Sequence, residues 1–242
     1  MVRLSVNVNK VATLRNSRGG EVPSLVDAVR VCLDAGAPGI TVHPRLDERH
    51  ITATDVRQIA ELLAPQRPAV EYNIEGDPRP DFLELVHEVK PDQVTLVPVR
   101  PGEVTSEAGW PSETSLDSVV ADLKAAGMRV SLFVNPSDEA IQWAHASGGD
   151  RVELFTEPYA DAAKEGPAPA RDSYEIYARA AETANGLGLG INAGHDLDLE
   201  NLILFRELPH LCEVSIGHAL ISRALFVGLE RVVREYIDIL TP

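Results

Sequence analysis

Cysteine, positive charge and long apolar runs are all scarce in this sequence. No apolar run approaches the roughly 20 residues that a membrane-spanning helix needs. The N-terminal stretch MVRLSVNVNK is too short and too polar to be a signal peptide. We therefore expect a cytoplasmic protein with no membrane partner.

The two cysteines, Cys32 and Cys212, each fall inside an apolar segment. Small buried thiols are expected there rather than a disulfide or a metal site. Lysine and arginine number 22 against 37 acidic residues, which gives a net charge of −15. Binding to nucleic acid or to an anionic membrane requires a basic surface, so both partners are excluded. An anionic substrate would need positive charge that is concentrated locally.

What the sequence does contain is an alternation of short β-rich runs with longer amphipathic ones, the pattern of βα units and a parallel sheet. The expected strands are 4–8, 39–43, 69–74, 93–99, 129–134, 151–155, 189–194 and 213–219. The expected helices are 24–36, 52–63, 81–90, 115–127, 137–148, 173–188, 199–208 and 220–240. Eight such units in 242 residues predict a single-domain α/β protein, a (β/α)₈ TIM barrel spanning 1–242.

Three connections from a strand to the next helix are long, whereas the return connections are short. The long connections are 9–23, 100–115 and 156–172, and we expect loops in all three. They follow the C-terminal ends of strands, the face on which barrel enzymes carry their active sites. Loops of this length are usually lids or binding loops.

Polar residues gather at the C-terminal ends of the expected strands, although strands buried on both faces should be apolar. They are Asn7, Asn9, His43, Glu71, Asn73, Asn135, Glu153, Asn192, His195 and His218. A single convergent site explains this pattern better than core packing does.

Proton exchange is the chemistry that these residues suggest. His43, His195 and His218 can exchange protons near neutral pH once burial tunes them. A carboxylate at Glu71, inside an apolar strand, would have a raised pKa and could serve as a general base. The alternative for Glu71, and more strongly for Glu153, is a structural ion pair inside the barrel.

Metal and covalent chemistry are less favoured. His43 and His50 are seven residues apart across a proline, and no further motif of metal-ligand spacing accompanies them. Lys10 follows the first strand and could form a Schiff base, but an anion contact is preferred.

Anion binding has better support. The segments INAGHD and SIGHALISRAL place glycines after strands seven and eight, where barrels form a phosphate site at a helix N-terminus. Two basic clusters suggest two anionic groups. These clusters are Arg15 with Arg18, and Arg45 with Arg49.

Motifs along essentially the whole chain resemble those of the pyridoxine 5'-phosphate synthase family of vitamin B6 biosynthesis. They are VNVNKVATLRNSRGG, GITVHPRLDERHI, VTLVP followed by EVTSEAGW, VELFTEPYA, INAGHDL and VSIGHALISRAL. The resemblance implies a barrel that joins 1-deoxy-D-xylulose 5-phosphate to 3-amino-2-oxopropyl phosphate, with release of phosphate and water. It also implies that no organic cofactor or metal is needed, and that the protein is a homo-octamer built from dimers.

The resemblance further implies a role for individual residues. His43 and Glu71 would accept protons, and His195 would donate one. The aminoketone phosphate would contact Asn7, Arg18, Asp196, Gly217 and His218, and the deoxyxylulose phosphate would contact Asn9, Lys10, Arg45, His50 and Thr105. Many members have Asp-His in place of Asn9-Lys10, and a small residue in place of Asp196. The expected lid is 100–115, because Thr105 lies on it.

Two other functions fit the same architecture. A phosphosugar isomerase or epimerase would use Glu71 as the base on a carbon acid. A catalytically idle barrel would only bind phosphorylated metabolites or act as a scaffold.

Overall fold

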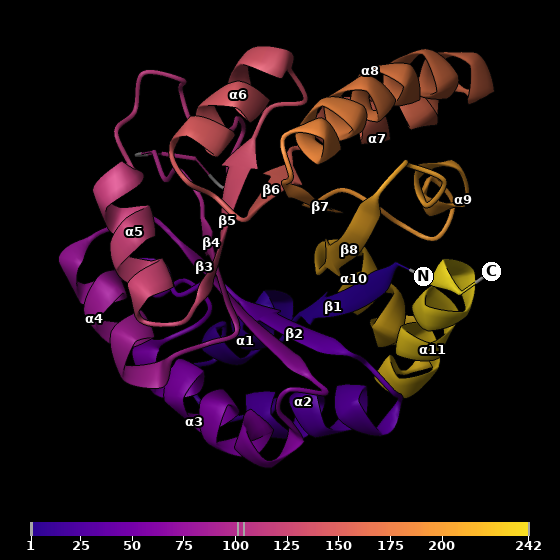
Figure 1. The fold of residues 1–242 in the computed structure, drawn as a ribbon. Helices are drawn as coiled ribbons and strands as arrows, with labels where there is room; N and C mark the ends of the chain where they lie inside the picture. The colour runs from indigo at the N-terminus through magenta and orange to yellow at the C-terminus, as the bar shows by residue number, and fades with distance from the viewer. Residues whose placement is uncertain (1, 101, 104, 242) are drawn as a thin grey trace.

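The computed structural model describes residues 2–100, 102–103 and 105–241, and its centre is a closed barrel of eight parallel strands. Each strand pairs with the next along the chain, and β8 pairs with β1 to close the cylinder (Figure 1). The strands are β1 (Arg3–Asn7), β2 (Gly39–Val42), β3 (Glu71–Gly76), β4 (Gln93–Leu96), β5 (Arg129–Val134), β6 (Arg151–Leu154), β7 (Gly190–Gly194) and β8 (Leu211–Ile216). The predicted (β/α)₈ fold is confirmed.

Helices surround this barrel on its outside (Figure 1). They are α1 (Asn9–Asn16), α2 (Leu25–Asp34), α3 (Ala53–Leu63), the short 3-10 turn η1 (Ala64–Gln66), α4 (Pro80–Val89), α5 (Asp117–Ala125), α6 (Asp138–Ala146), α7 (Glu157–Glu165), α8 (Pro167–Gly186), α9 (Leu202–Phe205), α10 (His218–Val227) and α11 (Leu229–Leu240). None of the helices in the described part of the chain is both long and apolar enough to cross a membrane.

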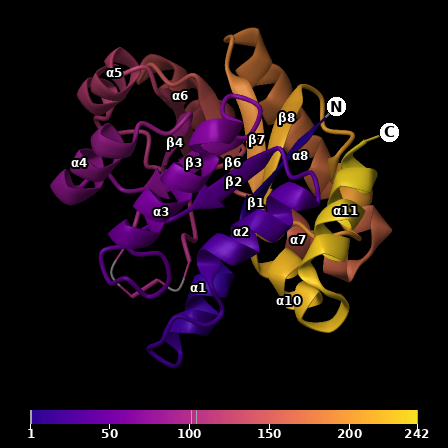
Figure 2. The same cartoon turned by 90° about the horizontal axis from the view of Figure 1, so that it is seen from below.

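Two of the three expected loops are partly or wholly helical. The segment 9–23 contains α1, which Figure 2 shows projecting on the side opposite the chain termini. The segment 156–172 forms α7 and the first turn of α8. Its prolines misled the prediction, because Pro158 and Pro167 each lie in the first turn of a helix, where a missing N–H costs nothing.

The C-terminal segment was predicted as one helix, and this is wrong at its centre. Gly228 has a φ of 93°, which ends α10 and starts α11 in a new direction. Left-handed backbone of this kind suits glycine because it has no Cβ. Leu225, in the last turn of α10, is 68% exposed.

The two faces of the barrel strands differ in polarity. Outward positions such as Val6, Ile40 and Ile74 are apolar and pack in the main core that includes the helices. Most inward positions are polar and buried along the length of the barrel, Phe133 being an apolar exception. The polar ones are Ser5, Thr41, Asn73, Gln93, Thr95, Ser131, Glu153, Asn192, Glu213 and Ser215. The polar character expected only at the strand ends therefore extends through the barrel interior.

Hydrogen bonds between adjacent strands connect many of these inward side chains. The Ser5 and Thr41 hydroxyls are 2.6 Å apart, and Thr95 donates to the side-chain oxygen of Asn73 at 2.9 Å. Such pairing offsets the cost of burying polar groups. The barrel interior thus fixes how neighbouring strands sit relative to one another, and with them the site at their ends.

Candidate active site

A cavity of about 340 Å³ lies at the C-terminal ends of the strands. Its lining residues come from β1, β3, β6 and β8, from α1 and the start of α10, and from the connections after β2, β4 and β7. They are Asn7, Asn9, Lys10, Thr13, His43, Arg45, Arg49, His50, Glu75, Thr105, Ser106, Glu153, His195, Asp196, Ser215, Gly217 and His218. Eleven of the thirteen predicted site residues are among them, and the two that are not are Glu71 and Arg18.

The predicted position of Glu71 is wrong. Glu71 is the first residue of β3 and pairs with Gly39, the first residue of β2, so it lies at the opposite end of the barrel from the cavity. Its carboxylate is 2.5 Å from the Arg129 guanidinium and 3.9 Å from that of Arg3. Glu71 therefore forms the structural ion pair that was the alternative interpretation.

Glu75 is the β3 carboxylate that reaches the cavity, and the sequence prediction missed it. It is 6% exposed, and its Oε2 lies 3.7 Å from Nδ1 of His43 and accepts a hydrogen bond from Asn7 at 3.5 Å. Burial, followed by the nearby Glu153 and Glu213 carboxylates, raises the pKa of Glu75 well above its ordinary value. The alternation in EYNIE, which puts Glu71 and Glu75 on the same face, was the available signal.

Glu153 is a second acid in the cavity, contributed by β6. It is 4% exposed, and burial raises its pKa to about 7. A group with this pKa can both give and take a proton near neutrality. The cavity thus contains two carboxyl groups, Glu75 and Glu153, whose burial favours the protonated form.

His43 lies just past β2, where Asn9 anchors it. The backbone N–H of His43 donates to the Asn9 side-chain oxygen at 3.0 Å. The backbone N–H of Asn9 in turn donates to the Asn7 side-chain oxygen at 3.0 Å. Burial, with the charges of His50 and Arg45 next, holds the pKa of His43 well below 6.5. The imidazole is therefore neutral at pH 7 and able to accept a proton.

His195 follows β7 in a left-handed conformation with a φ of 44°. The preceding Gly194 packs so closely on β8 that an added Cβ would lie 2.5 Å from the Ser215 carbonyl oxygen. Nε2 of His195 forms a short hydrogen bond with the Thr105 hydroxyl, which joins the predicted lid to the residues that line the cavity. Burial is the main cause that lowers the pKa of His195.

The positive charge near the cavity is smaller than the sequence suggested. Arg15 is paired with Asp55 at 2.9 Å, and Arg49 with Asp47 at 2.7 Å. Arg18 is exposed in the turn after α1 and does not line the cavity. The prediction that Arg15 and Arg18 form a basic cluster at the site is therefore not met in this structure.

Arg45 is the buried cation of the site. It is 6% exposed, and its Nε has no hydrogen-bond partner among the described residues. His50 lies nearby with its Nδ1 accepting the Ile51 N–H at 2.9 Å, so its neutral form carries a proton on Nε2. Lys10 is exposed at the rim of the same cavity. These three residues can hold an anion.

A second group of anion-binding features lies at the start of α10. Gly217 precedes the helix, His218 begins it, and both line the cavity. A Cβ on Gly217 would lie 3.1 Å from the Asn7 side chain, so glycine permits this close approach of β1 and β8. The first N–H groups of a helix lack partners within it and favour anions.

Within the part of the chain that the structure describes, no cluster of three or more histidine, cysteine or acidic side chains has the arrangement of a metal site. What the cavity does contain is neutral imidazoles, buried carboxyl groups and two places for anions. Fold and site together define a TIM-barrel enzyme that carries out acid/base chemistry on phosphorylated small molecules.

Comparison with known proteins specifies this class further. The chain belongs to the family of the pyridoxal phosphate biosynthesis protein PdxJ, whose family model matches residues 4–242. It is 52% identical over 240 residues to a pyridoxine 5'-phosphate synthase of Bacteroides fragilis, covering 98% of each chain. It is 47% identical over 254 residues to the synthase of Leptospira biflexa, covering 100% of this chain and 98% of the relative.

Solved structures of other enzymes share the fold. Thiamine phosphate pyrophosphorylase from Pyrococcus furiosus superposes with a TM-score of 0.63 at 16% identity, over 99% of this chain and 95% of that one. Phosphoribosyl anthranilate isomerase from Thermotoga maritima superposes with a TM-score of 0.62 at 14% identity, over 99% and 98%. At these identities the likeness describes the barrel alone.

Proposed function

We propose that this enzyme closes the pyridine ring of pyridoxine 5'-phosphate. It joins 1-deoxy-D-xylulose 5-phosphate to 3-amino-2-oxopropyl phosphate and releases phosphate and water. The observation that carries the proposal is that His43, Glu75 and His195 line one cavity of this family member together with two groups of residues suited to anions. Two phosphorylated substrates need two such places.

The chemistry explains why several proton-transfer groups are needed. Imine formation, dehydration, loss of phosphate and ring closure are all proton transfers, so the site needs several acids and bases in fixed positions. His43 and Glu75 are the proton acceptors, with Glu75 in the role first assigned to Glu71. Glu75 accepts a proton in its ionised form, which its raised pKa makes a strong base. His195, held by Thr105 on the loop 100–115, is the proton donor. Because burial lowers its pKa, His195 passes on a proton that it has first accepted. Closure of the loop excludes water.

Each phosphate is held by its own group of residues. Arg45, His50, Lys10 and Asn9 hold the deoxyxylulose phosphate, together with Thr105. Asn7, Asp196, Gly217 and His218 hold the aminoketone phosphate. Arg18 is exposed in this structure, and joins this second group only if the turn after α1 moves.

The decisive experiment is to mix the purified protein with both substrates and follow the absorbance of the pyridine ring. Ring formation with both substrates present, and with neither alone, supports the proposal. We expect the rate to survive dialysis against a chelator, because the proposed chemistry uses neither metal nor cofactor. Interconversion of a single phosphosugar without ring formation would instead identify an isomerase or epimerase.

We also propose that the protein is a cytoplasmic homo-octamer built from dimers. Phe226 is 88% exposed and Val22 81% exposed, and apolar side chains left in water favour contacts between subunits. Light scattering coupled to size-exclusion chromatography measures the mass directly. A value close to the 26.2 kDa of one chain would contradict the proposal.

A further inference from the structure

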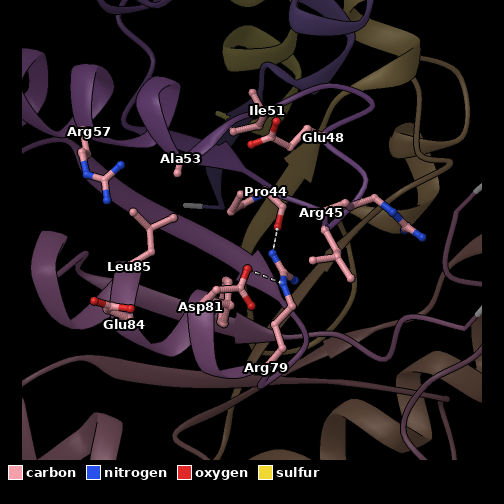
Figure 3. Close-up of a pocket in the computed structure, with 12 residues that line it drawn as sticks. Pro44, Arg45, Glu48, Ile51, Ala53, Arg57, Arg79, Asp81, Glu84 and Leu85 are labelled. Atoms are coloured by element: carbon pink, nitrogen blue, oxygen red, sulfur yellow. Dashed lines mark hydrogen bonds and ion pairs between the residues drawn. The ribbon is translucent and has the colours of Figure 1, made fainter.

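Arg79 is a nearly buried arginine that lies behind the cavity rather than in it. Its side chain is 13% exposed, and it precedes α4 in the connection from β3. One of its terminal nitrogens, Nη2, donates to the backbone carbonyl of Pro44 at 2.6 Å (Figure 3). Arg79 is not among the residues that line the 340 Å³ cavity.

Two carboxylates orient the guanidinium. Its Nη1 donates to Asp77 at 2.6 Å, and its Nε donates to Asp81 at 3.0 Å, the second bond being visible in Figure 3. All three nitrogens therefore bond to different groups, in directions that the planar guanidinium fixes. An ammonium group has no such fork and cannot keep all three partners in place.

Arg79 is also fixed to the end of β3 through Phe82. Its guanidinium carbon lies 5.6 Å from the centre of the Phe82 ring. That ring covers Gly76 so closely that an added Cβ would lie 2.4 Å from it. Gly76 directly follows Glu75, so the position of Arg79 is set by the strand end that carries the cavity's carboxyl group.

The partner of Arg79 at the end of β2 is the backbone carbonyl of Pro44. Pro44 stands between His43, the proposed base, and Arg45, the buried cation. A bond from Arg79 to the Pro44 carbonyl therefore ties the end of β2 to the end of β3. Across this connection, His43 Nδ1 and Glu75 Oε2 are held 3.7 Å apart.

We propose that Arg79 is a positioning residue that sets the placement of His43 and Arg45 relative to Glu75 by cross-linking the β2 and β3 strand ends. The proposal rests on the proposed function of those three residues. Proton transfer depends on donor and acceptor geometry, and a misplacement of about 1 Å can cost about 100-fold in rate. Arg79 therefore influences catalysis without touching a substrate.

The surroundings of Arg79 make the proposal testable. Arg79 lines a separate cavity of about 260 Å³, together with Pro44, Arg45, Arg57 and Leu85 (Figure 3). Truncation to alanine would enlarge this cavity and leave the Pro44 carbonyl without its donor. A small cation from solution could then occupy the vacated space.

We would compare Arg79→Ala with Arg57→Ala as the matched control. Arg57 lines the same 260 Å³ cavity but pairs with Glu88 on the protein surface, at 2.7 Å. For Arg79→Ala we expect kcat to fall about 10- to 100-fold. We expect KM to rise for the deoxyxylulose phosphate, which Arg45 holds, and to stay unchanged for the aminoketone phosphate. Arg57→Ala should keep wild-type kcat and both KM values.

Chemical rescue provides a second readout that a purely structural role would not give. Millimolar guanidinium should restore part of the kcat of Arg79→Ala, and urea at the same concentration should not. If Arg79→Ala does not fold, Arg79→Lys replaces it, and there we expect kcat to fall at least about threefold at an unchanged melting temperature.

Wild-type kcat and KM in a folded Arg79→Ala would overturn the inference. So would an equal rise in both KM values, or wild-type kinetics in Arg79→Lys where the alanine variant does not fold. Failure of the proposed function is distinguishable, because then the wild-type protein itself would form no pyridine product.

Discussion

At the residue scale, the arrangement around His43 makes the sharpest test of the site. The imidazole is buried and neutral, and its Nε2 has no hydrogen-bond partner among the described residues. We expect His43→Asn to lower kcat by about 10²- to 10⁴-fold, the usual range for loss of a general base. Melting temperature and circular dichroism should match the wild type. A His43→Asn enzyme with full turnover would remove His43 from the mechanism.

Glu71 and Glu75 offer a second test, because they lie on one strand and one face but at opposite ends of the barrel. Glu75→Gln should bind both substrates yet lose most of its turnover. Glu71→Gln should keep its kcat and instead lose roughly 2 kcal/mol of unfolding free energy, between the values for exposed and buried ion pairs. Steady-state kinetics and urea denaturation measure the two effects, and a reversed pattern would restore the original assignment of Glu71.

The error over Glu71 shows where residue-level prediction fails. The types of residue in the site, imidazoles with a strand carboxylate, followed from the sequence because polar groups interrupt apolar runs. The choice between two carboxylates four residues apart depended on strand bounds, 69–74 as expected against Glu71–Gly76 as found. Those bounds are set by pairing with β2 and β4, which are distant in sequence.

At the scale of elements, the loop 100–115 is anchored at its C-terminal part and joins the site through Thr105. The Gly109 N–H donates to the Asn135 side chain at 3.0 Å, and the Trp110 indole donates to the Leu96 carbonyl at 2.8 Å. A Cβ on Gly109 would lie 2.4 Å from the Val134 backbone, so the loop can approach β5 there only with glycine.

We therefore expect Gly109→Ala to displace the loop and to lower kcat by about 10-fold or more, because Thr105 would lose its contact with His195. Gly102→Ala, on the same loop, has no atom within 4 Å of the added Cβ but a φ of 90°. Gly102→Ala thus introduces backbone strain without a clash, whereas Gly109→Ala introduces a clash without a left-handed φ. Equal kinetics in both variants would contradict a specific role for the Gly109 contact.

Helices and strands could be predicted where the sequence pattern that indicates them is local. Alternating β-rich and amphipathic runs gave the barrel and most of its helices, since both periodicities arise within a few residues. Residues 156–172 were not predicted as helical, because proline at a helix start looks the same in sequence as proline in a loop. Whether it starts a helix depends on packing such as that of α7 against α8.

On the scale of the whole molecule, the buried acids make stability depend on pH. Glu213 is 1% exposed inside the barrel, and burial, followed by the charge of Glu71, raises its pKa from 4.5 to about 8. Between these values the folded protein holds a proton that the unfolded chain has released. The stabilisation from Glu213 is therefore complete below about pH 4.5 and is lost as the pH rises through 8.

The glutamine side chain of Glu213→Gln is neutral at every pH. The free energy of unfolding of this variant, relative to that of the wild type, should therefore increase by about 1 kcal/mol or more between pH 5 and pH 8.5. Melting temperatures at both pH values measure this difference. Glu235→Gln is the control, because the Arg223 contact lowers the pKa of Glu235 and keeps it ionised throughout this range. A difference for Glu213→Gln that does not change with pH would contradict the raised pKa.

The hydrogen-bonded lining of the barrel has a consequence for how such a sequence can diverge. A methyl group can be lost from an apolar core without leaving a polar partner unpaired. Loss of the Thr41 hydroxyl, by contrast, leaves the Ser5 hydroxyl without its partner, and loss of Thr95 leaves the Asn73 side-chain oxygen without its donor. Replacements that are tolerated at these positions should therefore occur as compensating pairs on adjacent strands of the barrel.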